Sequence, residues 1–208
     1  MITDLWLMPP HRMHMTTLEL AHSRTADDIA GLLATIRPAL PKLVNLTFTN
    51  RSRLVKPMIS YDLSAIAVSF LPAAGDKAVF PLHKQNGTGS GNGNVTSQDS
   101  YTYHHLRRDV YDLAQSTGVE IGSRYVVPSA HITLGRYLTH KDHDTPEKRE
   151  AWVRAIDDIN TWLEHEVWEL NDGNFVGEWF VGEERGLDAR AGTLWYGGGR
   201  TIMVGEGF

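Results

Sequence analysis

Two short stretches of the sequence pair a histidine with a threonine two residues later. His14 and Thr16 lie in HMTTLEL near the amino end, and His131 and Thr133 lie in PSAHITLGRY in the second half of the chain. Both stretches alternate apolar and polar residues, a pattern that predicts β-strands. Because alternate residues of a strand share a face, each histidine would lie beside its threonine, about 6.5 to 7 Å along the strand.

Two imidazoles and two hydroxyls that face one cleft suit the cleavage of a phosphodiester without a metal ion. One histidine can remove a proton from the attacking water or hydroxyl, while the other protonates the leaving oxygen. The hydroxyls can donate hydrogen bonds to the non-bridging oxygens as negative charge shifts onto them. Because one imidazole must be neutral and the other charged, the rate should fall at both acid and alkaline pH.

A third pair with the same spacing has a simpler explanation. His143 and Thr145 lie in the polar run THKDHDTPEK, where Thr145 is well placed to cap a helix. His14 and His131 differ from it, because each lies in an apolar alternating stretch that precedes a predicted helix, at corresponding positions of the two halves. Together these features favour a functional role over a structural one.

The elements expected around the motifs follow a similar order in the two halves of the chain. The first half predicts strands at 2–8 and 14–21, a helix at 25–36, and strands at 43–50 and within 54–71. The second half predicts a helix within 100–118, a strand at 130–138, a helix at 145–166, and short strands at 174–182, 192–196 and 201–204. The glycine-rich segment 86–97 is expected to be a mobile loop.

Composition limits the possible ligands. The chain has 208 residues, no cysteine, and a net charge of −5. Without cysteine, only histidines and carboxylates remain as metal ligands. The acidic balance disfavours a long nucleic acid and favours a small anionic ligand or an oligonucleotide end. No apolar run is long enough to span a membrane and no signal peptide is recognisable, so we expect a cytoplasmic or nuclear protein.

The two motif regions resemble the 2H phosphoesterase superfamily. The resemblance is carried by the stretches PPHRMHMTTLELAHSRT and PSAHITLGRY. The likeness is strongest to its fungal branch labelled RNA ligase or cyclic nucleotide phosphodiesterase, and it covers nearly the whole chain. The resemblance implies one bilobal α+β domain over residues 1–208, with two pseudo-symmetric antiparallel sheets flanked by helices around a central cleft. It also implies opening of a 2′,3′-cyclic nucleotide phosphate to a monoester, with no cofactor or metal. His14 and His131 would be the acid and the base, in an order left open, and Thr16 and Thr133 would hold the phosphate.

Several other residues receive weaker predictions. Three aromatic residues are candidates for stacking on a nucleobase: Tyr61, Tyr137 and Trp195. Alternation from His131 would point Arg136 to the opposite face of the strand, outside the site. His104 and His105 begin a predicted helix and suit solvated or capping roles. The run YGGGRT at 196–201 is best explained as a hairpin turn.

Two alternatives remain at this stage. The first is a module on the same fold that binds a nucleotide or an RNA end without turning it over. The second is a metallohydrolase with histidine and carboxylate ligands, which is the weakest because the sequence has no H-E-x-x-H spacing. For each of these functions we expect a monomer that does not bind membranes and whose ligand is a small nucleotide or an oligonucleotide end.

Overall fold

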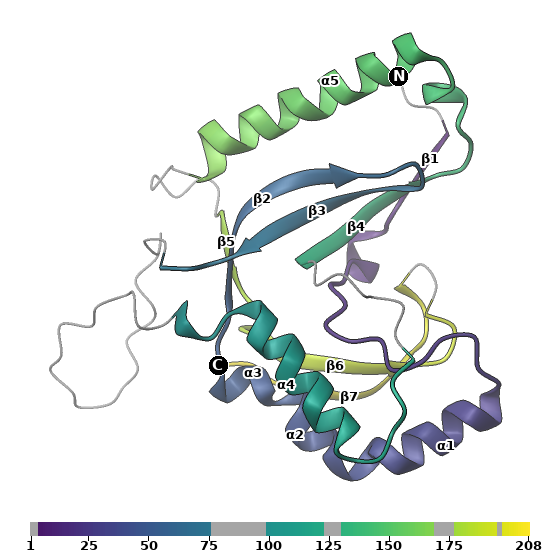
Figure 1. Ribbon diagram of the computed structural model, residues 1–208, viewed down its shortest axis with the longest axis vertical. Helices are drawn as coiled ribbons and strands as arrows, with labels where there is room; N and C mark the ends of the chain where they lie inside the picture. Colours follow the sequence, from purple (N-terminus) through teal and green to yellow (C-terminus); the bar gives the residue numbers. More distant parts are fainter. Residues whose placement is uncertain (1–3, 76–98, 123–129, 169–176, 195–196) are drawn as a thin grey trace, which may run out of the picture.

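A computed structural model describes residues 4–75, 99–122, 130–168, 177–194 and 197–208. It has an α+β fold with two antiparallel sheets, as predicted (Figure 1). The larger sheet has the strand order β1-β4-β3-β2-β5, with bounds Leu5–Leu7, Ala130–Tyr137, Ala65–Pro72, Arg53–Tyr61 and Glu178–Phe180. The smaller sheet pairs β6, Arg185–Ala191, with β7, Arg200–Glu206.

The helices lie above and below the larger sheet in the view of Figure 1. Helix α5, Pro146–Leu163, lies at the top. The lower half contains the smaller sheet and four helices, namely α1 (Ala26–Ile36), α2 (Leu40–Val44), α3 (Leu46–Thr49) and α4 (Tyr103–Gln115). No helix in the described ranges is both long and apolar enough to cross a membrane.

The long helices begin at the caps that the sequence predicts. The Thr25 hydroxyl accepts a hydrogen bond from the Asp28 N–H, and the Asp28 carboxylate accepts one from the Thr25 N–H, at 3.2 and 3.1 Å. These bonds to Thr25 lower the pKa of Asp28. At the start of α4, His105 Nδ1 accepts a hydrogen bond from the N–H of the N-cap Thr102 at 3.1 Å, which is a capping role. The Thr145 hydroxyl likewise caps α5.

Three of the strand predictions are wrong. Residues 43–50 contain the end of α2 and all of α3, because Leu40, Leu43 and Val44 are buried at helical spacing and Leu46 continues the same face. The short alternation of LVNLTFT is too brief to tell a strand from two turns of helix. Residues 192–194 are not in a strand, because β6 ends at Ala191, and residues 197–199 of the predicted turn lie just before β7 begins at Arg200.

The stretch 14–21 is the third correction, because it does not form a strand. It makes a single antiparallel bridge, between Met15 and Ile132 of β4. Beyond that bridge the chain leaves the sheet, and Leu18 and Leu20 pack against the hydrophobic core. The apolar side chains of HMTTLEL therefore pack against that core without forming a second ladder.

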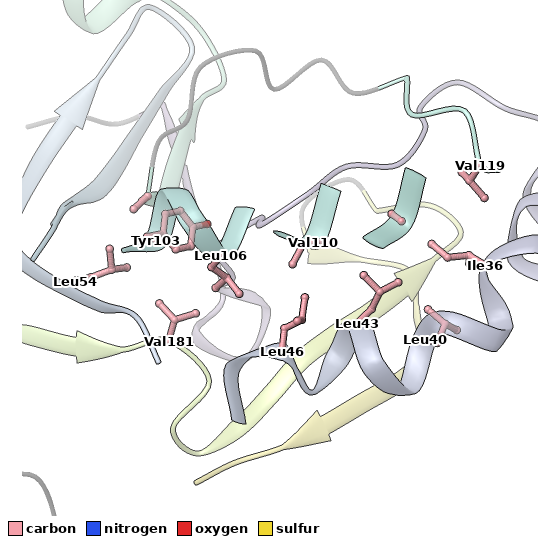
Figure 2. Packing of buried hydrophobic residues seen from close by; sticks show 12 residues of the cluster. Ile36, Leu40, Leu43, Leu46, Leu54, Tyr103, Leu106, Val110, Val119 and Val181 are labelled. Atoms are coloured by element: carbon pink, nitrogen blue, oxygen red, sulfur yellow. The ribbon is translucent and has the colours of Figure 1, made fainter. Parts of the chain in front are cut away.

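One hydrophobic core joins the two sheets. Its buried members come mainly from α1, α2, α3 and α4 and from the end of the larger sheet. Figure 2 labels Ile36, Leu40, Leu43, Leu46, Leu54, Tyr103, Leu106, Val110, Val119 and Val181, and the cluster also contains Ala114 and Ala130. Leu187 of β6 and Met203 of β7 pack against the same cluster. Residues from both sheets are therefore held by one set of contacts.

Helix α5 covers one face of the larger sheet. Leu5, Ile59 and Ile66 of the sheet line an apolar pocket together with Trp152 and Ile156 of the helix. Beyond the end of the short strand β5, backbone groups at the edge of β2 form hydrogen bonds with a side chain and not with a neighbouring strand. Asn160 Oδ1 accepts from the Ile59 N–H at 2.6 Å, and its Nδ2 donates to the Ile59 carbonyl at 3.0 Å. This arrangement protects an edge that could otherwise pair with another chain.

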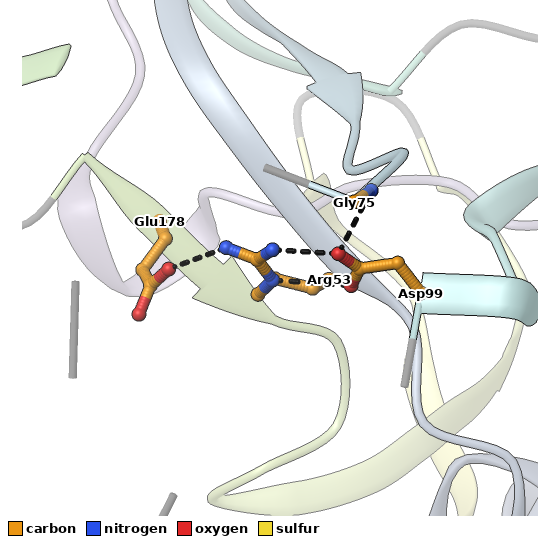
Figure 3. Close-up of polar contacts among 4 residues, drawn as sticks. All are labelled: Arg53, Gly75, Asp99 and Glu178. Atoms are coloured by element: carbon orange, nitrogen blue, oxygen red, sulfur yellow. Dashed lines mark hydrogen bonds and ion pairs between the residues drawn. The ribbon is translucent and has the colours of Figure 1, made fainter. Parts of the chain in front are cut away.

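A buried ion cluster fixes both ends of segment 76–98. Arg53 of β2 donates to the Asp99 carboxylate at 3.2 and 2.6 Å and to Glu178 of β5 at 2.8 Å, and Figure 3 shows the guanidinium between the two acids. Asp99 also accepts from the Gly75 N–H at 3.1 Å. Gly75 precedes this segment and Asp99 follows it, so the two residues that flank the segment lie close together.

Candidate functional site

The two histidine motifs meet at the edge of one strand. After β1, the Met8 N–H donates to the Leu134 carbonyl of β4 at 2.8 Å. A 3₁₀ turn at Pro10–Arg12 then carries the chain away from the sheet, and it returns at the bridge between Met15 and Ile132. Met15 lies between His14 and Thr16, and Ile132 lies between His131 and Thr133. The bridge therefore joins the centres of the two motifs.

The register of this bridge determines how the four side chains face each other. In an antiparallel pair, opposed residues point to the same side, with Cβ atoms about 4.5 to 5.5 Å apart. Extension of this register by one residue on each side of the bridge sets His14 opposite Thr133 and Thr16 opposite His131. Residues two apart along a strand are separated by about 7 Å. The four groups thus occupy the corners of a rectangle, with the histidines on one diagonal and the threonines on the other.

His14 is held by a backbone carbonyl. Its Nδ1 lies 2.8 Å from the Arg12 carbonyl oxygen at the end of the 3₁₀ turn, and its side chain is exposed. A carbonyl oxygen only accepts hydrogen bonds, so Nδ1 must carry the proton. Nε2 is then the ring nitrogen that can exchange a proton with a ligand, because its partner nitrogen is already engaged.

The backbone of the first motif is anchored by α4. The hydroxyl of Tyr103 donates to the Thr16 carbonyl at 3.3 Å, and the Tyr103 side chain is fully buried in the core. Burial raises the pKa of Tyr103, so the hydroxyl stays protonated as a donor. The lower half of the molecule thereby holds the segment that contains Thr16.

Small and hydroxyl side chains of β3 lie beside the second motif. Ser69 is paired with His131, and Ala67 with Thr133. The Ser69 hydroxyl is 2.6 Å from that of Ser60 on β2. Because cross-strand partners share a face, this hydroxyl pair lies on the same side of the sheet as the motif.

A β-bulge in β4 brings Arg136 to that same side, which corrects the prediction from simple alternation. Ala67 pairs with Thr133, but Ile66 pairs with Gly135, so the register shifts by one residue at Leu134. Ala65 and Ala67 lie two apart on regular β3, and their partners Arg136 and Thr133 therefore share one face.

Trp6 of β1 reaches this face as well, because it is the partner of Arg136 on the other side of β4. Neither Arg136 nor Trp6 was predicted to belong to the site, although the sequence contains one signal for this arrangement. An isolated glycine in a strand pattern, here Gly135, often marks a bulge. A Cβ at Gly135 would lie 2.9 Å from the Trp6 carbonyl oxygen, so the close approach of β1 requires glycine.

The predicted aromatic platforms lie elsewhere. Tyr61 and Tyr137 contact Trp152 of α5, with ring centroids 4.2 and 5.7 Å apart. Tyr61 pairs with Ile66 and Tyr137 with Leu5, residues that line the pocket under α5, so both rings are on the face opposite to the histidines. Trp195 and the segment 86–97 lie outside the described residues.

Within the described ranges, no three or more histidine and carboxylate side chains gather where they could hold a metal ion. Comparison with family models, with curated proteins and with solved structures finds no match to this chain. The resemblance to 2H phosphoesterases therefore rests on the two motifs themselves, and the functional argument rests on the geometry around them.

Proposed function

We propose that this protein is a metal-independent phosphodiesterase that opens a 2′,3′-cyclic or related cyclic nucleotide phosphate to a monoester. The observation that carries the proposal is the bridge between Met15 and Ile132. It brings together two motifs that are more than one hundred residues apart in sequence. Core packing alone does not require a histidine and a threonine of one motif to oppose a threonine and a histidine of the other.

The diagonal arrangement suits an in-line displacement at phosphorus. In such a step, the entering water and the leaving ribose oxygen are on opposite sides of the phosphorus atom. One histidine takes a proton from the water as the new P–O bond forms, and the other gives a proton to the 2′ or 3′ oxygen as its bond to phosphorus breaks. Thr16 and Thr133, on the other diagonal, would donate to the non-bridging oxygens. His14 can act through Nε2 in either role.

The neighbouring residues suggest how the rest of a nucleotide would bind. Arg136 shares the face of Thr133, where a guanidinium can bind an anionic oxygen. Trp6, the partner of Arg136, offers an aromatic surface on that face for a base. Ser69, the partner of His131, places a hydroxyl where a ribose oxygen could bind. These residues replace Tyr61 and Tyr137 as our candidates for binding the nucleoside.

The test is product analysis with the purified protein in excess chelator. The four nucleoside 2′,3′-cyclic monophosphates are incubated with the wild type, with His14→Ala and with His131→Ala. His104→Ala, which removes an exposed imidazole on α4, serves as the matched control. We expect each motif substitution to reduce the rate by about 10²- to 10⁴-fold, because a general acid or base is lost, while the control keeps its activity.

Other outcomes have defined meanings once circular dichroism shows that the variants are folded. Full activity of both motif variants would refute the two-histidine mechanism, and loss of activity in chelator would indicate a metal enzyme instead. If the wild type gives no product from these four compounds, ADP-ribose cyclic phosphate and 2′-5′-linked oligonucleotides are the next substrates. Binding of all of these ligands without any product would favour the non-catalytic module.

A further inference from the structure

The turn between β6 and β7 touches the segment that leads into the first motif. Gly197 lies in this turn with φ +69°. A Cβ at Gly197 would come within 2.5 Å of the Arg12 carbonyl oxygen and 2.8 Å of the Arg12 Cβ. No side chain fits at that distance, so glycine is needed both for the backbone conformation and for the close approach.

An arginine on β6 holds the turn in place. Arg190 donates from Nη1 to the Gly197 carbonyl at 3.3 Å and from Nη2 to the Gly199 carbonyl at 3.2 Å. The two nitrogens of a planar guanidinium thereby fix two carbonyls of one turn, which a lysine could not do with the same geometry. Asp188, on the same strand, accepts from the Thr201 hydroxyl of β7 at 3.2 Å and so ties the hairpin across its base.

The contact continues to the first histidine. The Arg12 carbonyl, against which Gly197 packs, is the oxygen that accepts the hydrogen bond from His14 Nδ1. We propose that the β6–β7 turn, held by Arg190, positions the Arg12 carbonyl and thereby fixes the Nδ1-protonated tautomer of His14. Arg190 acts through the turn and is a positioning residue. The importance of this tautomer for turnover rests on the proposed function, but the tautomer itself can be measured without any substrate.

The position of the carbonyl matters because neutral histidine in water prefers the other tautomer, with the proton on Nε2. That form presents an N–H to the ligand and cannot accept a proton there. A carbonyl held beside Nδ1 reverses the preference and leaves the Nε2 lone pair available, because the ring nitrogen that makes the supporting bond keeps the proton. A hairpin that moves by a fraction of an ångström would weaken this bond.

The experiment compares four variants of the full chain by the ¹⁵N and ¹H resonances of the histidine rings, which distinguish the tautomers. Gly197→Ala should push the Arg12 carbonyl away, and Arg190→Met should release the turn. Gly192→Ala is the matched control, because Gly192 also has positive φ, +101°, in the same hairpin, but its Cβ would meet nothing closer than Gly199 Cα at 3.8 Å. Arg190→Lys tests whether a charge alone is sufficient.

In the wild type and in Gly192→Ala we expect His14 to carry its proton on Nδ1. Gly197→Ala and Arg190→Met should shift His14 toward the Nε2-protonated form and lower kcat by about 10- to 100-fold with little change in KM, as is found when a histidine loses the partner that fixes its tautomer. Arg190→Lys should fall between the wild type and Arg190→Met.

An unchanged His14 tautomer in folded Gly197→Ala and Arg190→Met would overturn the inference, and so would an equal shift in Gly192→Ala. If one variant fails to fold, the other still decides the result. If the wild type shows the fixed tautomer and the variants lose it, but no cyclic phosphate is opened by any of them, the positioning inference stands and the proposed reaction fails. The two proposals are therefore distinguishable.

Discussion

Replacing Asp99 by asparagine tests how much the buried ion cluster stabilises the fold. Asp99 accepts two hydrogen bonds from Arg53 and one from the Gly75 N–H, and the side chains of Arg53, Asp99 and Glu178 are only 3 to 4% exposed. Asparagine has the same shape but turns one acceptor into an NH₂ donor that would face the guanidinium. Arg53 would keep a single buried carboxylate, Glu178.

Breaking a buried ion pair by removal of one charge destabilises a protein by about 3 to 5 kcal/mol, because the remaining charge loses its compensation. For a chain of this length, 1 kcal/mol corresponds to about 2 to 4 °C in Tm. Asp99→Asn should therefore lower Tm by about 6 to 20 °C, and guanidinium denaturation should show the same loss in the free energy of unfolding.

The control is Asp144→Asn, which removes one partner of the ion pair between Lys148 Nζ and Asp144 Oδ1. This pair has a similar length, 2.8 Å, but both side chains are 51% exposed. Water already solvates these charges, so the substitution should leave Tm nearly unchanged. Equal effects of the two substitutions would refute the reasoning, since burial is the main difference between them. A loss below about 1 kcal/mol in Asp99→Asn would do the same, because the pair would then behave as an exposed one.

Three further substitutions test single contacts. Asn160→Ala removes both hydrogen bonds to the Ile59 backbone and should destabilise the fold by about 1 to 3 kcal/mol in urea denaturation. Gly135→Ala should cost about 1 to 3 kcal/mol in the same assay, because the new Cβ meets the Trp6 carbonyl. Burial raises the pKa of Tyr137 from 10.0 to about 12, so the folded state holds a proton that the unfolded chain releases. Stability should fall as pH rises through that window, and Tyr137→Phe should make the fall shallower in Tm measurements across it.

Much of the fold was predicted from short sequence patterns, because these patterns are reliable where an element depends only on neighbouring residues. Thr25 and Thr145 cap their helices as expected, since a cap needs only the next three residues. The end of α2 and the whole of α3 were predicted as a strand, because the burial of these helices depends on α4 and on the smaller sheet, which are distant in sequence.

The candidate site was predictable in its residue types but not in its construction. The spacing in each motif identified His14 and His131, yet it placed them on two separate strands. In the structure, the first motif makes one bridge to the strand of the second. Strand alternation placed Arg136 outside the site, because this rule does not hold across the bulge in β4. A single extra residue reverses the face of every side chain that follows it, so errors of this kind affect whole strands.

The construction of the site links its geometry to packing in the lower half of the molecule. Residues 14–16 have one bridge to the sheet, which is too little to fix a segment on its own. The chain is held on the far side by Leu18 and Leu20 in the core and by the bond from Tyr103 to the Thr16 carbonyl, and on the near side by the contact of Gly197 with Arg12. Substitutions in this core should therefore alter the separation of the two histidines before they unfold the chain. Activity would then respond more sensitively than Tm to changes in the packing of this core.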